Sequence, residues 1–311
     1  MADLAPAPVG VPELPVGDQL DEFGAEAESQ SRRIVRRFVH HRLAMASLVV
    51  LLVLMTASFL GETITSYRYD ELTPDTNQPP SSKHWFGTDF IGHDMFTLVL
   101  RGARRSILVA LIVAALATSF GATVGALAGY YRGLLDTVLM RVTDLFLTIP
   151  SLAVLLVLAS RYRGQSGNWM AIALVIAAFA WMPLARVVRG MFLSLREREF
   201  VEAARALGAS DSRIILRHLL PNSLAPIIVN ATLLVAAAIL IETALSFLGF
   251  GIAPPDTSLG RLVAEGSNAS YTRPWMFYLP GLWLMLICLC INFVGDGLRD
   301  AIDPRDARVR A

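Results

Sequence analysis

The stretch EAARALGASDSRIILRHLLPN, Glu202–Asn222, is charged and broken by a glycine, yet it separates two long apolar runs. Strong helix formers run from Glu199 to Leu207, and this segment has one apolar stripe with charged residues beside it. The stripe consists of Phe200, Ala203, Ala204 and Leu207. Gly208 supplies the freely twisted backbone expected just after a helix C-terminus. We therefore predict a short amphipathic helix that ends before Gly208.

A second helix is expected directly after this glycine. Ser210 or Asp211 can cap its start, and it would run to Leu219. Pro221 is then expected to stop or bend the chain. An isolated amphipathic helix can lie on a membrane surface, but such helices usually carry bulky apolar residues opposite Lys and Arg. The small alanines and acidic neighbours in this stretch favour docking into a groove of another protein.

The composition places this hairpin in a membrane protein. Of the 311 residues, 54% are hydrophobic and 17% charged, with a mean hydropathy of +0.53, which excludes an ordinary soluble globule. A spanning helix needs about 20 apolar residues. The segments between charges that reach this length are Leu43–Gly61, Ser106–Tyr131, Gly164–Ala185, His218–Ile241 and Pro274–Gly295. A net charge of +1 argues against a nucleic-acid-binding surface.

The segment Leu145–Ser160 is too short to span a membrane unless its helix begins upstream. The longer helix would include Arg141 and Asp144, which are three residues apart and can pair on one helix face. With this segment, we predict six transmembrane helices. The chain is thus expected to be an all-α polytopic membrane protein.

The distribution of Lys and Arg predicts the orientation, because cytoplasmic segments near helix ends are enriched in them. With the N-terminus inside, 18 of the 27 Lys and Arg residues fall on the cytoplasmic side. Both termini are therefore expected in the cytoplasm, although Arg101, Arg104 and Arg105 oppose the trend. The first apolar run follows too long an approach for a cleaved signal peptide, so it is expected to remain as an anchor.

Charged residues in the apolar region are candidates for a translocation path or for structural ion pairs, namely Glu242, Asp144 and Arg141. An unpaired carboxylate is costly in a membrane, so Glu242 is expected to face a partner or a wet cavity, or to carry a proton. Gly121, Gly125 and Gly129 form a small-xxx-small pattern that lets another backbone approach closely. These glycines are assigned to helix packing and to no chemistry.

Glu202, Ala203 and Ala204, followed by Gly208 and then Leu220-Pro221, resemble the EAA loop in membrane subunits of ABC importers that use a soluble binding protein. Further segments resemble the C-type permease subunit of dipeptide, oligopeptide and nickel importers: Phe86–Ala110, Gly129–Leu152, Leu245–Leu262 and Asn292–Arg305. The positions that depart from the family pattern are His93, His218 and Leu259. Those at 93 and 259 lie on the predicted outer side, where they bear on docking of the binding protein or on substrate choice.

This resemblance implies the type I ABC importer permease fold, with a cytoplasmic coupling helix that an ATPase moves. The residues implied in coupling are Glu202, Ala203, Ala204, Gly208, Leu220 and Pro221. The implied partners are a homologous second permease subunit, two cytoplasmic ATPase subunits and an extracytoplasmic substrate-binding protein. The chain lacks a G-x-x-x-x-G-K-[ST] phosphate loop, so ATP and Mg are expected only in the partner ATPases, and no enzyme activity or cofactor is expected here. The implied location is the bacterial plasma membrane.

The implied substrates are short peptides, with nickel or another small solute as the alternative. A proton-coupled secondary transporter with Glu242 and Asp144 as relays would predict inverted repeats and broken midplane helices, neither of which is visible in the sequence. A third alternative, a structural membrane scaffold, would not need a coupling helix and would tolerate its deletion. The residues of metal-ligand type near the second span are His84, His93, Asp89 and Asp94. Their spacing is not a recognised ligand set, so no metal site is predicted.

The chain is expected to divide into consecutive units. Residues 1–30 hold seven acidic and no basic side chains and are predicted to be a disordered cytoplasmic tail. Cys288 and Cys290 point to nearly opposite faces of the last helix, so no disulfide is predicted. The other expected units are the N-terminal arm with the first helix (31–63), an extracytoplasmic segment (64–105), a permease core with five helices and the EAA loop at 192–222 (106–300), and a cytoplasmic tail (301–311).

Overall fold

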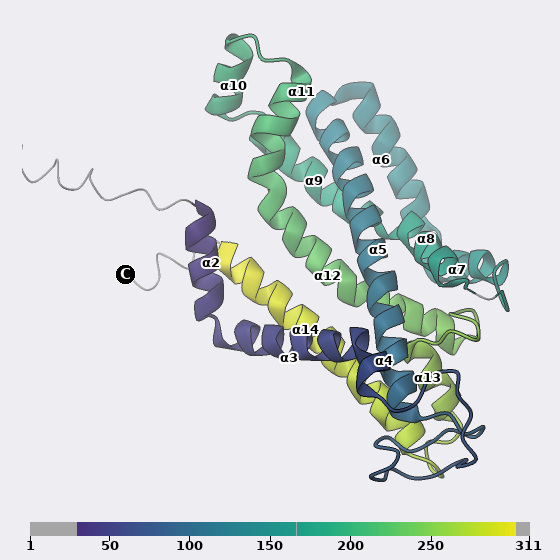
Figure 1. Cartoon of the computed structure of the whole chain (residues 1–311). Coiled ribbons are helices and arrows are strands. Elements are labelled where there is room, and N and C mark those ends of the chain that lie inside the picture. Colours follow the sequence, from purple (N-terminus) through teal and green to yellow (C-terminus); the bar gives the residue numbers. More distant parts are fainter. Residues whose placement is uncertain (1–29, 166, 303–311) are drawn as a thin grey trace, which may run out of the picture.

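A computed structural model describes residues 30–165 and 167–302, and every regular element in these ranges is a helix (Figure 1). The tails predicted at 1–30 and 301–311 lie outside these residues, except at their inner ends. The hairpin formed by α10 and α11 projects at the top of Figure 1, and the loops around α4 and α13 lie at the bottom. We refer to these as the α10 end and the α13 end.

The helices follow one another with few long connections. The first part of the chain forms α2 (Gln30–His40), α3 (Arg42–Phe59), α4 (Gly61–Ile64), α5 (Met95–Tyr131), α6 (Gly133–Thr148), α7 (Ser151–Ser160), α8 (Trp169–Ala180) and α9 (Met182–Leu195). The second part forms α10 (Glu199–Ala206), α11 (Asp211–Arg213), the π-helical turn η1 (Ile214–Leu219), α12 (Leu220–Phe247), α13 (Leu259–Ser267) and α14 (Trp275–Ile302).

Four helices of the described ranges are long and apolar enough to cross a membrane: α3, α5, α14 and the continuous helix Asp211–Phe247. Two further spans form if the bent pairs α6–α7 and α8–α9 each count as one, with bends of 80° and 40°. The higher count equals the six spans predicted from the sequence.

The predicted span Leu145–Ser160 is not one straight helix. α6 ends at Thr148, and α7 begins at Ser151. Proline disfavours helical backbone in the residue before it, and Ile149, which precedes Pro150, has an extended ψ of 134°. The sequence contained this signal, but the apolar run around it concealed the break.

The central helix α5 begins earlier than the predicted Ser106. It starts at Met95, where Asp94 caps it by accepting a hydrogen bond from the Thr97 amide at 2.9 Å. The predicted outer segment 64–105 therefore ends in helix rather than in loop. The prediction failed because charges were taken as the limit of a span, whereas a helix can continue beyond the apolar layer.

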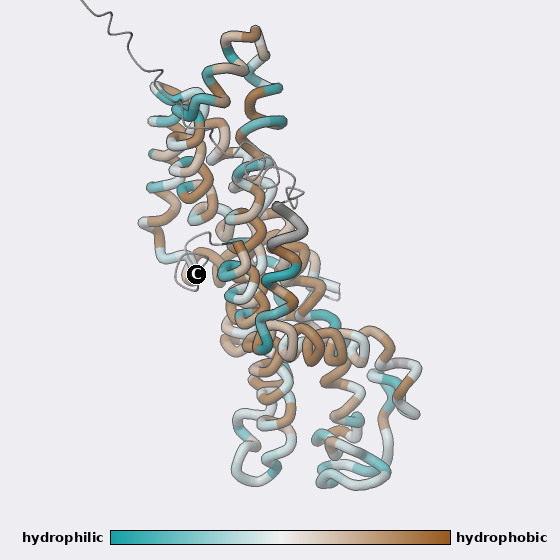
Figure 2. The backbone as a smooth tube through the Cα atoms, turned by 90° about the vertical axis from the view of Figure 1, so that its left-hand side faces the viewer, coloured by the Kyte–Doolittle hydropathy of each residue, from teal (hydrophilic) through white to brown (hydrophobic). Residues whose placement is uncertain are grey.

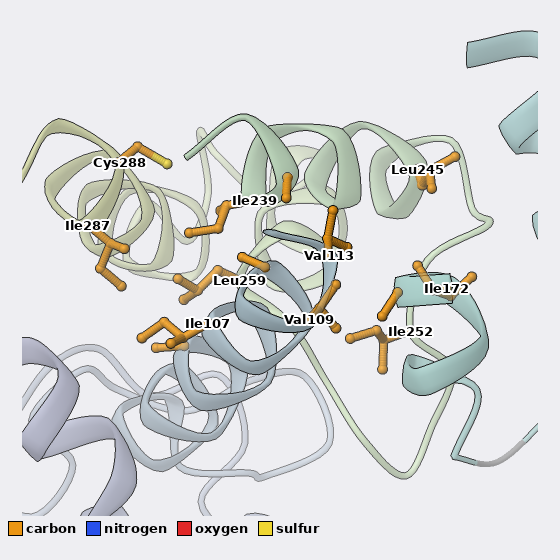
Figure 3. Close-up of a cluster of buried hydrophobic side chains, with 14 of the residues drawn as sticks. Ile107, Val109, Val113, Ile172, Ile239, Leu245, Ile252, Leu259, Ile287 and Cys288 are labelled. Carbon is orange, nitrogen blue, oxygen red and sulfur yellow. The ribbon is translucent and has the colours of Figure 1, made fainter. Parts of the chain in front are cut away.

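The main hydrophobic core surrounds α5. Its buried side chains come from α3, α5, α7, α8, α12, α13 and α14, together with the loop before α13. Figure 3 shows side chains from several of these helices converging, among them Val109 of α5, Ile172 of α8 and Ile239 of α12. Close packing of this kind is the main force that associates helices in lipid.

Apolar residues also cover much of the outside of the bundle. Figure 2 shows hydrophobic residues along the helices through the middle of the molecule and more hydrophilic loops at the α13 end. In α3, Val49, Leu52 and Val53 are all exposed. Outward apolar faces of this extent suit contact with lipid or with a partner subunit rather than with water.

Candidate functional site

The hairpin at the α10 end has the two helices that the sequence predicts. Gly208, which follows α10, has a φ of +78°, as expected after a helix C-terminus. A Cβ added at this glycine would meet no atom within 4 Å, so the positive φ alone requires glycine there. The second helix begins at Asp211, after Ser210 in extended backbone.

Pro221 was expected to stop or bend the chain, and it does not stop the second helix. Residues Ile214–Leu219 widen into the π turn η1, and α12 continues from Leu220 without a break. Pro221 lies just after the π turn and inside this continuous helix, where its missing N–H removes one backbone hydrogen bond. The hairpin is therefore directly continuous with a spanning helix.

Burial splits the predicted apolar stripe of α10. Phe200 and Leu207 are 40% and 89% exposed, and Ala203 is exposed beside them. Ala204 instead faces the chain's own core and is only 9% exposed. Val201, which the sequence analysis did not single out, is fully buried next to it. The helix thus has one face toward its own bundle and a second apolar face that is free.

The remaining predicted coupling residues include exposed ones and one that is partly buried. Glu202 and Pro221 are exposed, whereas Leu220 is partly buried and packs under the hairpin. Leu216 on η1 adds a further exposed apolar side chain. Exposed apolar residues with charged neighbours at the tip of a projecting element are typical of a protein-docking surface.

A small second core holds the hairpin on the bundle. It consists of Ala126, Tyr130, Leu184, Val188, Phe192, Val201, Ile214, Leu219 and Ile227. These residues come from α5, α9, α10, η1 and α12, so the hairpin packs on the ends of α5 and α9. The only sequence signal for it was the spacing of apolar residues on the inner face of α10, which gives no indication of the helices opposite.

The three glycines of α5 lie against α9. An added Cβ would stand 2.5 Å from the Trp181 carbonyl oxygen at Gly121, 2.4 Å from that of Ala185 at Gly125, and 2.6 Å from the Phe192 Cβ at Gly129. Contacts this short leave no room for any side chain. The predicted close approach of another backbone is therefore present, and its partner is a helix of the same chain.

The acidic residues of α6 pair with arginines of α9 rather than with Arg141 of their own helix. Arg186 donates a hydrogen bond to Asp144 at 2.5 Å, and Arg189 donates two to Asp136, at 2.5 and 2.7 Å. Arg141 takes part in no ion pair within residues 30–165 and 167–302. The predicted pair of Arg141 with Asp144 is wrong, because residue spacing reveals neighbours within a helix but not across to the next one.

Glu242 is completely buried between α5, α12 and the start of α13. Its carboxylate accepts hydrogen bonds from the Ser246 hydroxyl at 2.7 Å and from the Ser106 hydroxyl at 3.2 Å. Ser106 in turn accepts a hydrogen bond from the Leu259 amide at 3.2 Å, which connects the carboxylate to the first turn of α13. The expected partner of Glu242 is thus a set of hydroxyls, and these join three helices.

The residues considered as metal ligands form separate pairs. His84 Nδ1 lies 2.9 Å from Asp94 Oδ2, and His93 Nδ1 lies 2.8 Å from Asp89 Oδ2. Asp94 also caps α5, and Asp89 also accepts hydrogen bonds from backbone amides of the loop. These contacts stabilise the fold of the segment before α5.

Comparison with known proteins assigns the chain to a family. Residues 121–307 match the model for binding-protein-dependent transport system inner membrane components, and residues 29–80 match the N-terminal transmembrane domain of oligopeptide transport permease C. The chain belongs to this permease family. It is a multi-pass membrane protein and a permease subunit of an ABC importer, a class of subunit that works with ATPase and binding-protein partners.

Curated relatives cover almost the whole chain. The oligopeptide transport system permease protein OppC of Mycobacterium tuberculosis (strain H37Rv) is 47% identical over 288 residues, which are 91% of this chain and 98% of that protein. A putative peptide transport system permease protein of Brucella abortus biovar 1 is 42% identical over 272 residues, 87% and 90% of the two chains.

A solved structure supports the fold. The inward-facing MetNI methionine ABC transporter superposes with a TM-score of 0.52 at 20% identity, over 67% of this chain and 97% of that chain. At this identity the likeness concerns the fold alone. Together with the family match, it shows the type I importer permease fold that the EAA loop implied.

Proposed function

We propose that this chain is the membrane subunit through which an ATP-driven importer moves oligopeptides, and that α10 is the helix on which the ATPase acts. The observation that carries this proposal is the division of α10. Val201 is fully buried in the small second core, while Phe200 and Leu207 are exposed at the tip of the molecule. A helix that is fixed on one side and open on the other can transmit the movement of a partner to the bundle.

The partners would occupy opposite ends of the subunit. Two ATPase subunits would dock at the α10 end of this chain and of a homologous second permease subunit. A substrate-binding protein would deliver its load at the α13 end. ATP and Mg would bind to the ATPases, since this sequence lacks a phosphate loop. The α10 end, which lies within the Arg-rich segment at residues 186–217, would face the cytoplasm of a bacterial cell, together with both termini.

Packing determines how movement of α10 would open the path. The backbones of α5 and α9 are in contact along the glycines, and the small core joins both helices to the hairpin. These elements can therefore shift as one rigid body between two arrangements. ATP would bias the equilibrium because the closed ATPase pair contacts the hairpin differently from the open pair.

The substrate assignment rests on the relatives. Permeases named for oligopeptide or peptide transport align over nearly the full length of this chain. Selection of peptide length and sequence would rest mainly with the binding protein. Nickel or another small solute is the alternative cargo.

The test is ATP-dependent uptake of labelled peptide by the complete complex in proteoliposomes, with ATP hydrolysis measured in parallel. Gly208→Pro cannot keep a φ of +78°, and Glu202→Lys reverses a charge on the exposed face of α10, so both should separate hydrolysis from uptake. Asp296→Lys, a reversal of an exposed charge on α14 outside the hairpin, is the matched control. Normal coupling in both hairpin variants would show that α10 has no such role.

A further inference from the structure

We infer that Tyr130 and Asp211 form the contact that fixes the hairpin's orientation on α5, and that Tyr130 is thereby a positioning residue for coupling. The inference rests on the proposed function and adds to it a specific transmission point. The Tyr130 hydroxyl donates a hydrogen bond to Asp211 Oδ1 at 2.6 Å, across 81 residues of sequence. A length of this order is typical of a charge-assisted bond between a hydroxyl and a carboxylate.

The two residues occupy the ends of the elements that must move together. Tyr130 is in the last turn of α5, and Asp211 is the first residue of α11. Helix α11 continues through η1 and α12 as a single helix to Phe247. The bond therefore joins the end of one spanning helix to the start of another, at the base of the hairpin.

Tyr130 is also held from two other directions. Its ring is 5% exposed and lies in the small core with Phe192 of α9 and Val201 of α10. Its carbonyl oxygen accepts a hydrogen bond from Arg196, which follows α9. Tyr130 thus lies where the ends of α5 and α9 meet α10 and α11.

The directional bond has a role that apolar packing cannot supply. The small core would hold a phenylalanine ring at position 130 in the same place, because phenylalanine makes the same apolar contacts. A hydrogen bond to a charged group depends strongly on angle and distance. Loss of the hydroxyl should therefore leave the hairpin attached but less strictly oriented relative to α5.

The neighbouring residue provides a matched control. Tyr131 is also at the end of α5, and its ring stacks edge-on against that of Tyr130. Its side chain is half exposed, and its hydroxyl makes no hydrogen bond within the described parts of the chain. Tyr131→Phe removes the same atom as Tyr130→Phe, one residue away, without touching the proposed contact.

The experiment compares Tyr130→Phe, Asp211→Ala, the double variant and Tyr131→Phe in the complete importer in proteoliposomes. The readout is peptide taken up per ATP hydrolysed. Each single variant should lower this ratio at least about tenfold, as expected for the loss of a hydrogen bond to a charged group. The double variant should be no worse than either single one, because both substitutions remove the same bond. The thermal unfolding temperature of the purified complex should stay close to that of the unsubstituted protein.

Two results would overturn the inference: a ratio in Tyr130→Phe equal to that in Tyr131→Phe, or additive losses in the double variant. Asp211 is exposed, so Asp211→Ala gives an independent answer if Tyr130→Phe fails to assemble. Gly208→Pro, measured alongside, separates a failure of this inference from a failure of the proposed function. If it uncouples while Tyr130→Phe does not, only this inference fails, whereas normal coupling in Gly208→Pro removes the proposed function itself.

Discussion

Asp256 Oδ2, in the loop that joins α12 to α13, lies 2.6 Å from Arg105 Nη2 of α5, and both side chains are largely buried. The same carboxylate accepts a hydrogen bond from Arg101 at 2.9 Å. Arg105 also covers the Trp169 ring at 4.8 Å, and Arg101 covers the Tyr69 ring at 4.3 Å. These arginines opposed the charge distribution expected for the outer side, and the structure gives them a role in joining the loop to α5.

Asp256→Asn should destabilise the α13 end. The substitution removes the negative charge that both arginines face, and loss of one partner from a largely buried pair is costly, here about 2 kcal/mol after allowance for partial exposure. Chemical unfolding of the purified protein in detergent would measure this change. Asp70→Asn, which breaks the exposed pair with Arg68, should have little effect. Equal stability of the two variants would contradict the prediction.

Glu242 should tolerate glutamine but not alanine. Glu242→Ala leaves the buried hydroxyls of Ser106 and Ser246 without their acceptor, at a cost of about 1–3 kcal/mol. Glu242→Gln keeps the shape and one acceptor oxygen, so its cost should be well below that of alanine. The same unfolding assay applies, with Glu265→Ala at a partly exposed pair as control. Identical losses for glutamine and alanine would show that charge, rather than the hydrogen bonds, stabilises this site.

A single methyl group should disturb the contact between α5 and α9. Gly125→Ala places a Cβ 2.4 Å from the Ala185 carbonyl oxygen, and forced overpacking costs about 1–3 kcal/mol. Gly190→Ala, in α9, meets no atom within 4 Å and should instead stabilise its helix by about 0.5–1 kcal/mol. Opposite signs in a thermal unfolding assay are the expected outcome. A stabilising effect at both positions would mean that the two backbones are not in contact.

The segment before α5 should lose stability in acid through Asp75. The Lys83 ammonium donates a hydrogen bond to this carboxylate and holds the pKa of Asp75 below its usual value of 3.8, and His84 adds to the effect. Because the folded pKa is the lower one, the contribution is complete above the unfolded value and is lost as the pH falls through the folded value.

The free energy of unfolding, measured across the acid range, should therefore fall with pH in the unsubstituted protein. The fall should be smaller in Asp75→Asn. The difference should be confined to pH values below about 4, where the two pKa values lie. An identical acid profile for both proteins would show that this pair does not stabilise the segment.

Much of the fold could be predicted from apolar segments alone. The segments Leu43–Gly61 and Pro274–Gly295 coincide with most of α3 and α14, because a single apolar segment in lipid can satisfy its own backbone only as a helix. The bend at Pro150 and the early start of α5 could not be placed by charge-to-charge distances. Those distances measure where an apolar layer ends, whereas helices begin and end at caps and prolines.

For the candidate site, only the features set by neighbouring residues in the sequence could be predicted. Gly208 and the amphipathic α10 followed from residue preferences, which act over a few neighbours. The bonds of Tyr130 to Asp211 and of Asp144 to Arg186 join residues 81 and 42 positions apart. Such pairs depend on how helices are placed against one another, and one sequence does not contain that arrangement explicitly.

The π turn at Ile214–Leu219 has a consequence for how the length of this hairpin can vary. A π turn accommodates one residue more than an α turn, so the removal of one residue there would leave an ordinary α-helix with both flanks in their original phase. Single-residue deletions should therefore be accepted inside this turn and rejected in α10 or in the body of α12. Variation in the length of related chains, and any engineered shortening of the hairpin, should concentrate at this place.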